Sequence, residues 1–320
     1  MKYNFDEIIN RENTNCIKWD YRNEVFQNPD VIPLWVADMD FKTPDFIMDA
    51  IRKMAEHEIM GYCFRPASFF ESARDWLKRR NNWQTDSKDM SFIPGIVPAL
   101  GFAVEAFTNK GDKIVVQTPV YHPFFAAVKD HDRELVENSL TEKDGYYTID
   151  FKDLETKLSG GAKMLILCNP HNPVGRVWTK DELQKIGDLC VKYDIMIVSD
   201  EIHSDLVFKP HKHIHIASLS DDIAKRTITF IAPSKTFNQA GLATAIAHSV
   251  NEEILKAFNK QLEIWHVGMG NIFGNVALEA AYKYGDEWLD QLLEYLDGNM
   301  EYIKSYLEEN IPQVKTRKSE

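Results

Sequence analysis

The chain has 320 residues, of which 44% are hydrophobic and 27% are charged, and its formal net charge is −12. This length and apolar content predict one large domain, or a large domain with a smaller companion, around a sizeable core. The negative charge argues against nucleic acid as a partner, because the phosphate backbone would be repelled. No apolar run approaches the length of a membrane span, and the N-terminal residues do not resemble a signal peptide.

The cysteines indicate a reducing compartment. None of the four forms a C-x-x-C pair, and Cys168 and Cys190 fall in apolar stretches, where a small buried thiol is expected. The other two are Cys16 and Cys63. We therefore expect a cytoplasmic protein.

Strand-like and helix-like patterns alternate along the middle of the chain. Strands are expected at 113–117, 163–168, 195–199, 227–231 and 244–249. Helices are expected at 45–56, 67–81, 97–107, 121–130, 150–158, 179–193, 251–264, 272–284 and 287–309. This alternation predicts an α/β fold in which a mostly parallel, mixed sheet is sandwiched by helices.

A glycine-rich stretch, Gly268-Met-Gly270-Asn-Ile-Phe-Gly274, imitates a dinucleotide-binding motif. Its spacing differs from G-x-G-x-x-G, and no predicted strand leads into it. We expect a loop before a helix at this position, so the sequence does not indicate a nicotinamide-dependent enzyme.

Three short motifs each follow an apolar, strand-like run. They are Asn169-Pro-His-Asn-Pro-Val-Gly175, Ser199-Asp-Glu-Ile-His203 and Ser234-Lys-Thr-Phe-Asn238. The carboxyl ends of parallel strands meet at one edge of a sheet, where open α/β folds bind ligands. The motifs would bring together an amide, a carboxylate and an amine: Asn172, Asp200 and Lys235. These are the groups that pyridoxal 5'-phosphate (PLP) needs.

The order of these motifs resembles fold-type I PLP-dependent enzymes of the class I/II aminotransferase superfamily. The stretches Trp35-Val-Ala-Asp-Met-Asp-Phe41 and Ala232-Pro-Ser-Lys-Thr-Phe-Asn238 are similar to the cystathionine β-lyase (C–S lyase) branch. The resemblance implies a large PLP-binding domain at 44–285. An N-terminal arm at 1–43 and an incomplete small α/β domain at 286–320 would complete the PLP-transferase fold.

The resemblance implies a role for each central residue. Lys235 would form the Schiff base and move the substrate α-proton, and a lowered pKa would make its amine nucleophilic. Asp200 would hold a proton on the pyridine nitrogen. Asn172, in a candidate cis bond to Pro173, would donate to the ring phenolate. The alternatives are a surface lysine, a helix N-cap at Asp200 and an ordinary Asn-Pro turn.

Further cofactor contacts are implied around these three residues. Tyr121 would stack on the ring, with a core tyrosine at the start of a helix as the alternative. His203 would orient Asp200 or hold the ring oxygen, unless it is a structural histidine. The phosphate would be bound by Ser234 and by a helix N-terminus. That N-terminus is formed by Gly95, Ile96 and Val97.

Tyr62 would reach the phosphate of a neighbouring subunit, which implies a homodimer with a shared active site. An ordinary interface or core tyrosine is the alternative. Tyr62 is thus a candidate catalytic residue together with Lys235 and Tyr121.

The chain departs from the superfamily pattern in two places. Ala232 and Ala243 stand where many members have a Ser and an Arg that bind phosphate. The stretch Pro312-Gln-Val-Lys-Thr-Arg-Lys-Ser-Glu320 stops before the part of the small domain that holds the Arg for the substrate carboxylate. No Arg of this chain can be matched to that one, although the cofactor site is expected to be largely encoded.

Three alternating histidines, His211, His213 and His215, would share one face of a strand. Such a face could bind a metal ion, but a polar surface loop is the preferred interpretation, and no metal site is predicted.

The implied activity is that of a PLP-dependent C–S β-lyase, which would cleave cystathionine or cysteine S-conjugates to a thiol, pyruvate and ammonia. Trp35 and Asp38 would line the substrate side, although Trp35 could instead pack under the small domain. One alternative is a PLP-dependent aminotransferase, because α-proton removal is common to both reactions. The other is a truncated, catalytically weak PLP-binding protein with a regulatory role.

Overall fold

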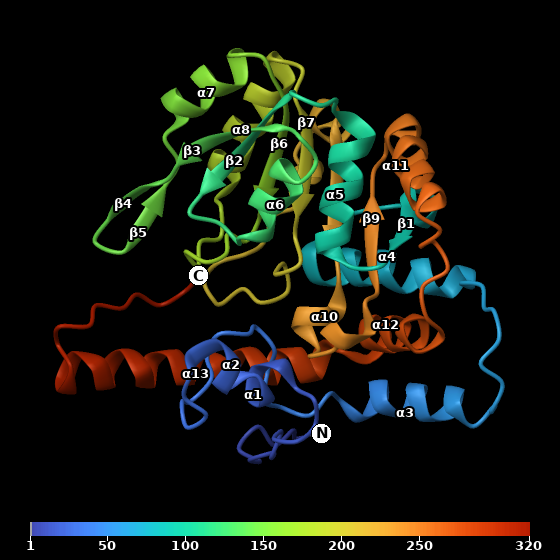
Figure 1. Cartoon of the computed structure of the whole chain (residues 1–320), viewed down its shortest axis with the longest axis vertical. Helices are drawn as coiled ribbons and strands as arrows, with labels where there is room; N and C mark the ends of the chain where they lie inside the picture. The colour runs from blue at the N-terminus through green and yellow to red at the C-terminus, as the bar shows by residue number, and fades with distance from the viewer. Residues whose placement is uncertain (1) are drawn as a thin grey trace.

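The computed structural model describes residues 2–320, with a seven-stranded sheet at its centre (Figure 1). The strand order is β1-β9-β8-β7-β6-β2-β3. Strands β3, β2, β6, β7 and β8 are parallel neighbours, whereas β9 pairs antiparallel with both β8 and β1. The predicted mixed, mostly parallel sheet is therefore confirmed. The strands are β1 (Met90–Ile93), β2 (Lys113–Thr118), β3 (Glu134–Ser139), β6 (Ala162–Cys168), β7 (Met196–Asp200), β8 (Thr227–Ile231) and β9 (Ala245–His248).

Successive residues of the central strands face two different helical layers, as the pleat requires. Leu165 and Ile197 pack against α7 (Phe151–Ser159) and α8 (Lys180–Lys192). Ile166 and Val198 face the opposite way. That second layer consists of α5 (Ile96–Phe107), α6 (Pro123–Lys129) and α11 (Glu252–Ile264).

A third apolar cluster joins the β1–β9 side of the sheet to the base of the molecule in Figure 1. Trp288 of α13 is buried there, and its ring lies 5.7 Å from Phe5 and 5.5 Å from Phe237 between centroids. The N-terminal arm is thus attached to the core through α13. The helices of this cluster are α3 (Asp45–Ala55), α4 (Ala67–Asn81), α12 (Ile272–Tyr284) and α13 (Asp286–Asn310).

Short elements complete the chain. They are α1 (Ile17–Asp20), α2 (Arg22–Phe26), α9 (Asp221–Ala224), α10 (Pro233–Thr236), the hairpin β4 (Thr141–Lys143) and β5 (Tyr146–Thr148), and single 3₁₀ turns at Ser87–Asp89, Ile216–Ser218 and Ala240–Leu242. None of the helices within residues 2–320 is long and apolar enough to cross a membrane.

Local sequence signals account for most element boundaries. Thr179 caps α8 through a capping box in which the Glu182 N–H donates to the Thr179 hydroxyl and the Glu182 carboxylate accepts the Thr179 N–H. The sequence analysis missed β1, which has only four residues, the three-residue strands β4 and β5, and the edge strand β3, in which polar residues interrupt the apolar pattern. The glycine-rich stretch is a loop before α12, as expected. The division into a 44–285 domain and flanking segments stays a prediction.

We expect Trp288→Ala to lower the free energy of unfolding by about 3–5 kcal/mol, because a large buried side chain is lost. Tyr302→Ala is the matched control on the same helix. Tyr302 is 69% exposed, so its loss should change stability by less than about 0.5 kcal/mol. Urea unfolding measures both, and equal midpoints for the two variants would contradict the assigned core.

Candidate active site

The three motifs meet at the carboxyl ends of the parallel strands β6, β7 and β8. The Asn169 N–H donates to the Asp200 carbonyl at 3.0 Å, which ties the first motif to the second. The segment after β2 joins them, because the Tyr121 N–H donates to the Asn172 carbonyl at 3.1 Å. The sheet thus gathers the predicted side chains at one edge, as expected from strand direction.

Asp200 is the last residue of β7 and is only 5% exposed. Its carboxylate accepts the Ile202 N–H at 3.1 Å. Burial is the main cause that raises the pKa of Asp200, the charge of Glu201 adds to it, and the Ile202 N–H and the charge of Lys235 oppose it; the resulting pKa is about 7. A buried acid of this kind is stabilised by a cationic donor placed against it.

Lys235 lies in α10, and its amine donates to the Ala37 carbonyl at 2.9 Å. Burial lowers the pKa of Lys235, and the charges of Asp38 and Asp200 oppose that shift. Asp38 is itself held by Arg11 at 2.9 Å. The N-terminal arm therefore positions the amine through a backbone carbonyl, a contact for which the sequence holds no signal.

A cavity of about 220 Å³ borders Asn172 and His203. Burial, and to a lesser degree the charge of Lys235, lowers the pKa of His203 to about 4, so this imidazole is neutral at neutral pH. The Asn172–Pro173 bond is cis, as predicted. The cavity is also lined by Ala37, Pro170, His171, Pro173, Gly175, Val177, Leu206, Ser319 and Glu320.

Tyr121 is 39% exposed and therefore is not a core residue. Burial and the nearby charge of Asp200 raise its pKa. The charge of Asp200 thus acts on the Tyr121 hydroxyl, and both residues lie at the same edge of the sheet.

The predicted phosphate-binding residues lie at the start of α5 and in α10. Gly95 is the residue before α5 and has φ 123°, a conformation that side chains other than that of glycine rarely adopt. Within residues 2–320, no side chain caps the N-terminus of α5. Its first N–H groups, near the buried Ile96 and the half-exposed Val97, are therefore open to an anion. Ser234 lies in α10, next to Lys235.

Two predicted residues lie apart from the cavity. Tyr62 is 96% exposed in the loop between α3 and α4, so a single chain does not bring it to the site. The Trp35 indole donates to the Lys18 carbonyl at 3.1 Å and packs against Phe26.

The interpretation of the three histidines as a polar surface loop is wrong for two of them. His211 is exposed, but His213 and His215 are buried, and both ring nitrogens facing Glu201 bond its carboxylate. No strand carries these histidines within the described chain. Potential ligand atoms of Glu201, His213 and His215 lie within 4.8 Å of one another, as metal ligands do, but each imidazole is hydrogen-bonded directly to the Glu201 carboxylate.

The C-terminal segment contributes residues that the sequence analysis missed. The Glu320 carboxylate accepts the Arg176 Nε–H and the Val177 N–H, both at 2.9 Å, and Ser319 lines the cavity beside it. Arg176 is 2% exposed, so this is a buried ion pair. Only the tertiary fold brings residues so distant in sequence together.

Comparison with curated proteins places these features in a family. The sequence profile "Aminotransferase class I and II" matches residues 29–319. Cystathionine beta-lyase PatB of Bacillus subtilis (strain 168) is 44% identical over 317 residues, which cover 98% of this chain and 82% of that protein. Cystathionine beta-lyase of Corynebacterium glutamicum is 33% identical over 304 residues, which cover 95% of this chain and 79% of that protein.

Solved structures agree with the same assignment. A PLP-bound putative aminotransferase from Clostridium difficile 630 superimposes with a TM-score of 0.98 at 44% identity, covering 100% of this chain and 82% of that one. The PLP-bound C-S lyase from Staphylococcus hominis gives a TM-score of 0.92 at 36% identity, covering 99% and 80%. With a family match over nearly its whole length, the chain belongs to the aminotransferase class I and II family.

Proposed function

We propose that this protein is a PLP-dependent C–S β-lyase that cleaves cystathionine or cysteine S-conjugates to a thiol, pyruvate and ammonia. The observation that carries the proposal is the placement of Asn172, Asp200 and Lys235 at or just after the carboxyl ends of the neighbouring strands β6, β7 and β8. Its similarity to cystathionine β-lyases, at up to 44% identity, favours carbon–sulfur cleavage.

The described residues fit this cofactor. The buried acid Asp200 has the environment in which a pyridinium N–H is a favourable partner. The Asn172 amide would donate to the ring oxygen, with His203 beside it, and Tyr121 would cover one face of the ring. Gly95, Ile96, Val97 and Ser234 would hold the phosphate.

Lys235 would bond to the cofactor aldehyde and, once released by substrate, would carry the α-proton. Its lowered pKa increases the fraction of neutral, nucleophilic amine at neutral pH. When bound, PLP supplies the electron sink for the charge that develops at the substrate α-carbon. A thiolate at Cβ would then leave, whereas a substrate without such a leaving group would permit transamination.

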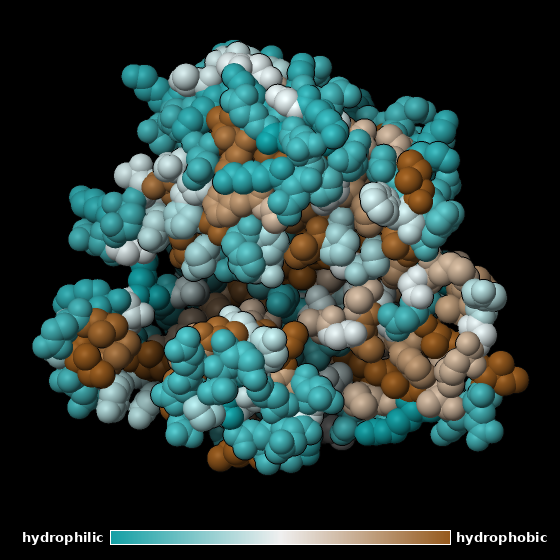
Figure 2. Space-filling model, viewed as in Figure 1, coloured by the Kyte–Doolittle hydropathy of each residue, from teal (hydrophilic) through white to brown (hydrophobic). Residues whose placement is uncertain are grey.

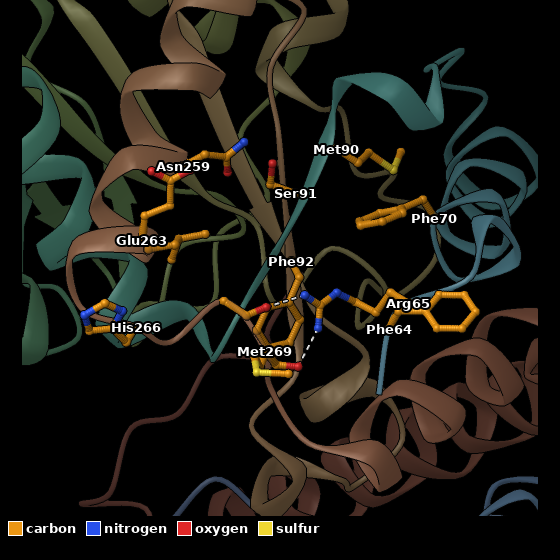
Figure 3. Close-up of a pocket in the computed structure, with 12 residues that line it drawn as sticks. Phe64, Arg65, Phe70, Met90, Ser91, Phe92, Asn259, Glu263, His266 and Met269 are labelled. Atoms are coloured by element: carbon orange, nitrogen blue, oxygen red, sulfur yellow. Dashed lines mark hydrogen bonds between the residues drawn. The ribbon is translucent and has the colours of Figure 1, made fainter. Parts of the chain in front are cut away.

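The active unit in this proposal is a homodimer. Exposed apolar residues cluster in the loop between α3 and α4, at the lower right of Figure 2. The Arg65 guanidinium donates to the Met269 carbonyl at 2.7 Å and to that of Gly268, and it lies over the Phe92 ring at 4.1 Å (Figure 3). These contacts join the loop to the segment before α12, beside a cavity of about 850 Å³.

A group of exposed apolar side chains of this kind is typical of an interface. A second copy would cover it and would bring Tyr62 to the partner's phosphate site. Its exposed apolar residues are Ile59, Met60, Tyr62, Phe64, Ile264, Trp265 and Met269.

The proposed location is the cytoplasm, because all four cysteines are free, as expected in a reducing compartment.

The reaction is tested with purified, PLP-loaded protein and L-cystathionine. We expect equal amounts of free thiol and pyruvate, measured with a thiol reagent and with lactate dehydrogenase, and no turnover by Lys235→Ala. Borohydride treatment followed by peptide mapping should label Lys235. Turnover that requires a keto-acid acceptor and releases no thiol would instead indicate the aminotransferase.

The role of Asp200 is tested in the PLP-free protein through pH. The pKa of Asp200 is about 7 in the folded state and about 3.9 when unfolded, so the folded state holds the proton more tightly. Protonation of Asp200 therefore stabilises the folded state fully below about pH 4, and this stabilisation is lost as the pH rises to about 7. The total loss in the free energy of unfolding is on the order of 4 kcal/mol.

We expect Asp200→Asn to lack this loss of stability and bound PLP to reduce it in the wild type. Unfolding midpoints between pH 4 and 8 measure both effects. Identical pH profiles for wild type and Asp200→Asn would contradict the assignment.

The homodimer is tested by Phe64→Glu, which places a charge in the apolar surface, where Phe64 is 84% exposed. We expect a dimer for the wild type and a monomer for the variant by size-exclusion chromatography with light scattering. Ile303→Glu is the control, because Ile303 is also exposed but lies on α13. A monomeric wild type would disprove the proposed interface.

A further inference from the structure

A fully buried carboxylate, Glu201, lies directly behind the proposed cofactor contact. It follows Asp200 in the chain, and its side chain is 0% exposed. One oxygen accepts the Ser199 hydroxyl at 2.8 Å and the Ile216 N–H at 3.4 Å. The other oxygen accepts hydrogen bonds from two imidazoles. All these partners are donors, which is the arrangement that stabilises an ionised carboxylate.

The two imidazoles are His213 and His215, and both are buried. The His213 Nε2–H donates to Glu201 at 2.8 Å, and the His215 Nδ1–H donates to the same oxygen. Within residues 2–320, the opposite ring nitrogen of each histidine has no hydrogen-bond partner. A second proton on either ring would bury an N–H without an acceptor. Each ring therefore has one N–H for Glu201 and no acceptor for a second.

Aromatic side chains pack around these imidazoles. His215 stacks on Trp83 at 4.3 Å between ring centroids, and His248 of β9 meets the same indole at 4.7 Å. Both ring nitrogens of the buried His248 lack partners within the described chain, and burial lowers the pKa of His248 to about 4, so this imidazole is neutral at neutral pH. Asp205, beside His213, bonds Trp76 and Thr236 instead.

The backbone keeps Glu201 and Asp200 in a fixed relation. The Glu201 N–H donates to the Phe230 carbonyl at 2.9 Å, and the Asp200 carbonyl accepts the Asn169 N–H at 3.0 Å. Successive residues of a strand point to opposite faces, so Glu201 faces the histidines while Asp200 faces the site. Lys235, Tyr121 and the buried Cys168 are the other titratable groups whose electrostatics are coupled to Asp200.

We propose that Glu201 is a positioning residue whose permanent negative charge, held by His213 and His215, strengthens proton binding at Asp200 and at the cofactor nitrogen that Asp200 would contact. The inference rests on the proposed pairing of Asp200 with PLP. A neighbouring anion in a poorly solvated site favours the protonated state of its neighbour.

The test compares Glu201→Gln, which removes the charge at constant shape, with Ser199→Ala, which removes one hydrogen bond and keeps the charge. In PLP-free protein, the pH step that depends on Asp200 is isolated by subtracting the profile of Asp200→Asn in each background. We expect Glu201→Gln to move the midpoint of this step at least about half a pH unit lower, and Ser199→Ala to leave it in place.

In PLP-loaded protein, the midpoint of the pH-dependent change in the visible absorbance of the cofactor should move in the same direction in Glu201→Gln alone. If the stability step that depends on Asp200 in the PLP-free protein is present but does not move in Glu201→Gln, the role of Glu201 is wrong and that of Asp200 stands. If this stability step is absent in the wild type, both roles are wrong.

A measurement on the wild type covers the case in which Glu201→Gln does not fold. Nitrogen-15 NMR of the histidine rings from pH 5 to 8 should show neutral His213 protonated at Nε2 and neutral His215 protonated at Nδ1. An imidazolium signal from either ring at pH 7 would mean that the charge is neutralised, and the inference would be wrong. Elemental analysis that finds one metal ion per chain, displaced from these side chains by Glu201→Gln, would overturn it as well.

Discussion

The parallel pairing of β6, β7 and β8 is the constraint on which the site depends. Cys168 pairs with Asp200, and Asp200 pairs with Phe230, so the loops that carry Asn172, Asp200 and Lys235 leave the sheet at one level. A slip of one residue in β7 would exchange the faces of Asp200 and Glu201. The buried apolar residues of β7 on both faces oppose such a slip, because each is matched to a different helical layer.

The electrostatics of the site follow from that register. Two acids, Asp200 and Glu201, are consecutive and buried, yet their partners differ completely. Burial raises the pKa of Glu201, but the imidazoles of His215 and His213 outweigh it and hold that pKa well below the usual range. Within residues 2–320, Asp200 receives a single backbone N–H and has a raised pKa. The fold therefore leaves one carboxylate available for a ligand and stabilises the other, at some expense in stability of the cofactor-free protein.

Much of the fold and of the central site could be predicted from the sequence. The strand β8 was predicted with its observed bounds, because a short run of β-branched and aromatic residues followed by a polar motif is typical of a strand. Weak local signals were missed, as in the polar edge strand β3. His213 and His215 were misjudged because alternation in a polar loop does not reveal that a buried acid lies opposite. The Ala37 carbonyl and the contact between Glu320 and Arg176 join distant segments and leave no local trace.

The sequence by itself determined the chemistry: three motifs in fixed order, the strands that precede them and the amine, acid and amide that they supply. These follow from local patterns, because hydrophobic periodicity and residue type act over a few neighbours. The tertiary structure alone decided which groups are buried and what faces them. Examples are the Ala37 carbonyl that accepts the Lys235 amine, the imidazoles that bond Glu201 and the C-terminal residues that line the cavity. Burial and long-range contacts depend on how layers pack, and they fix the pKa values on which the chemistry depends.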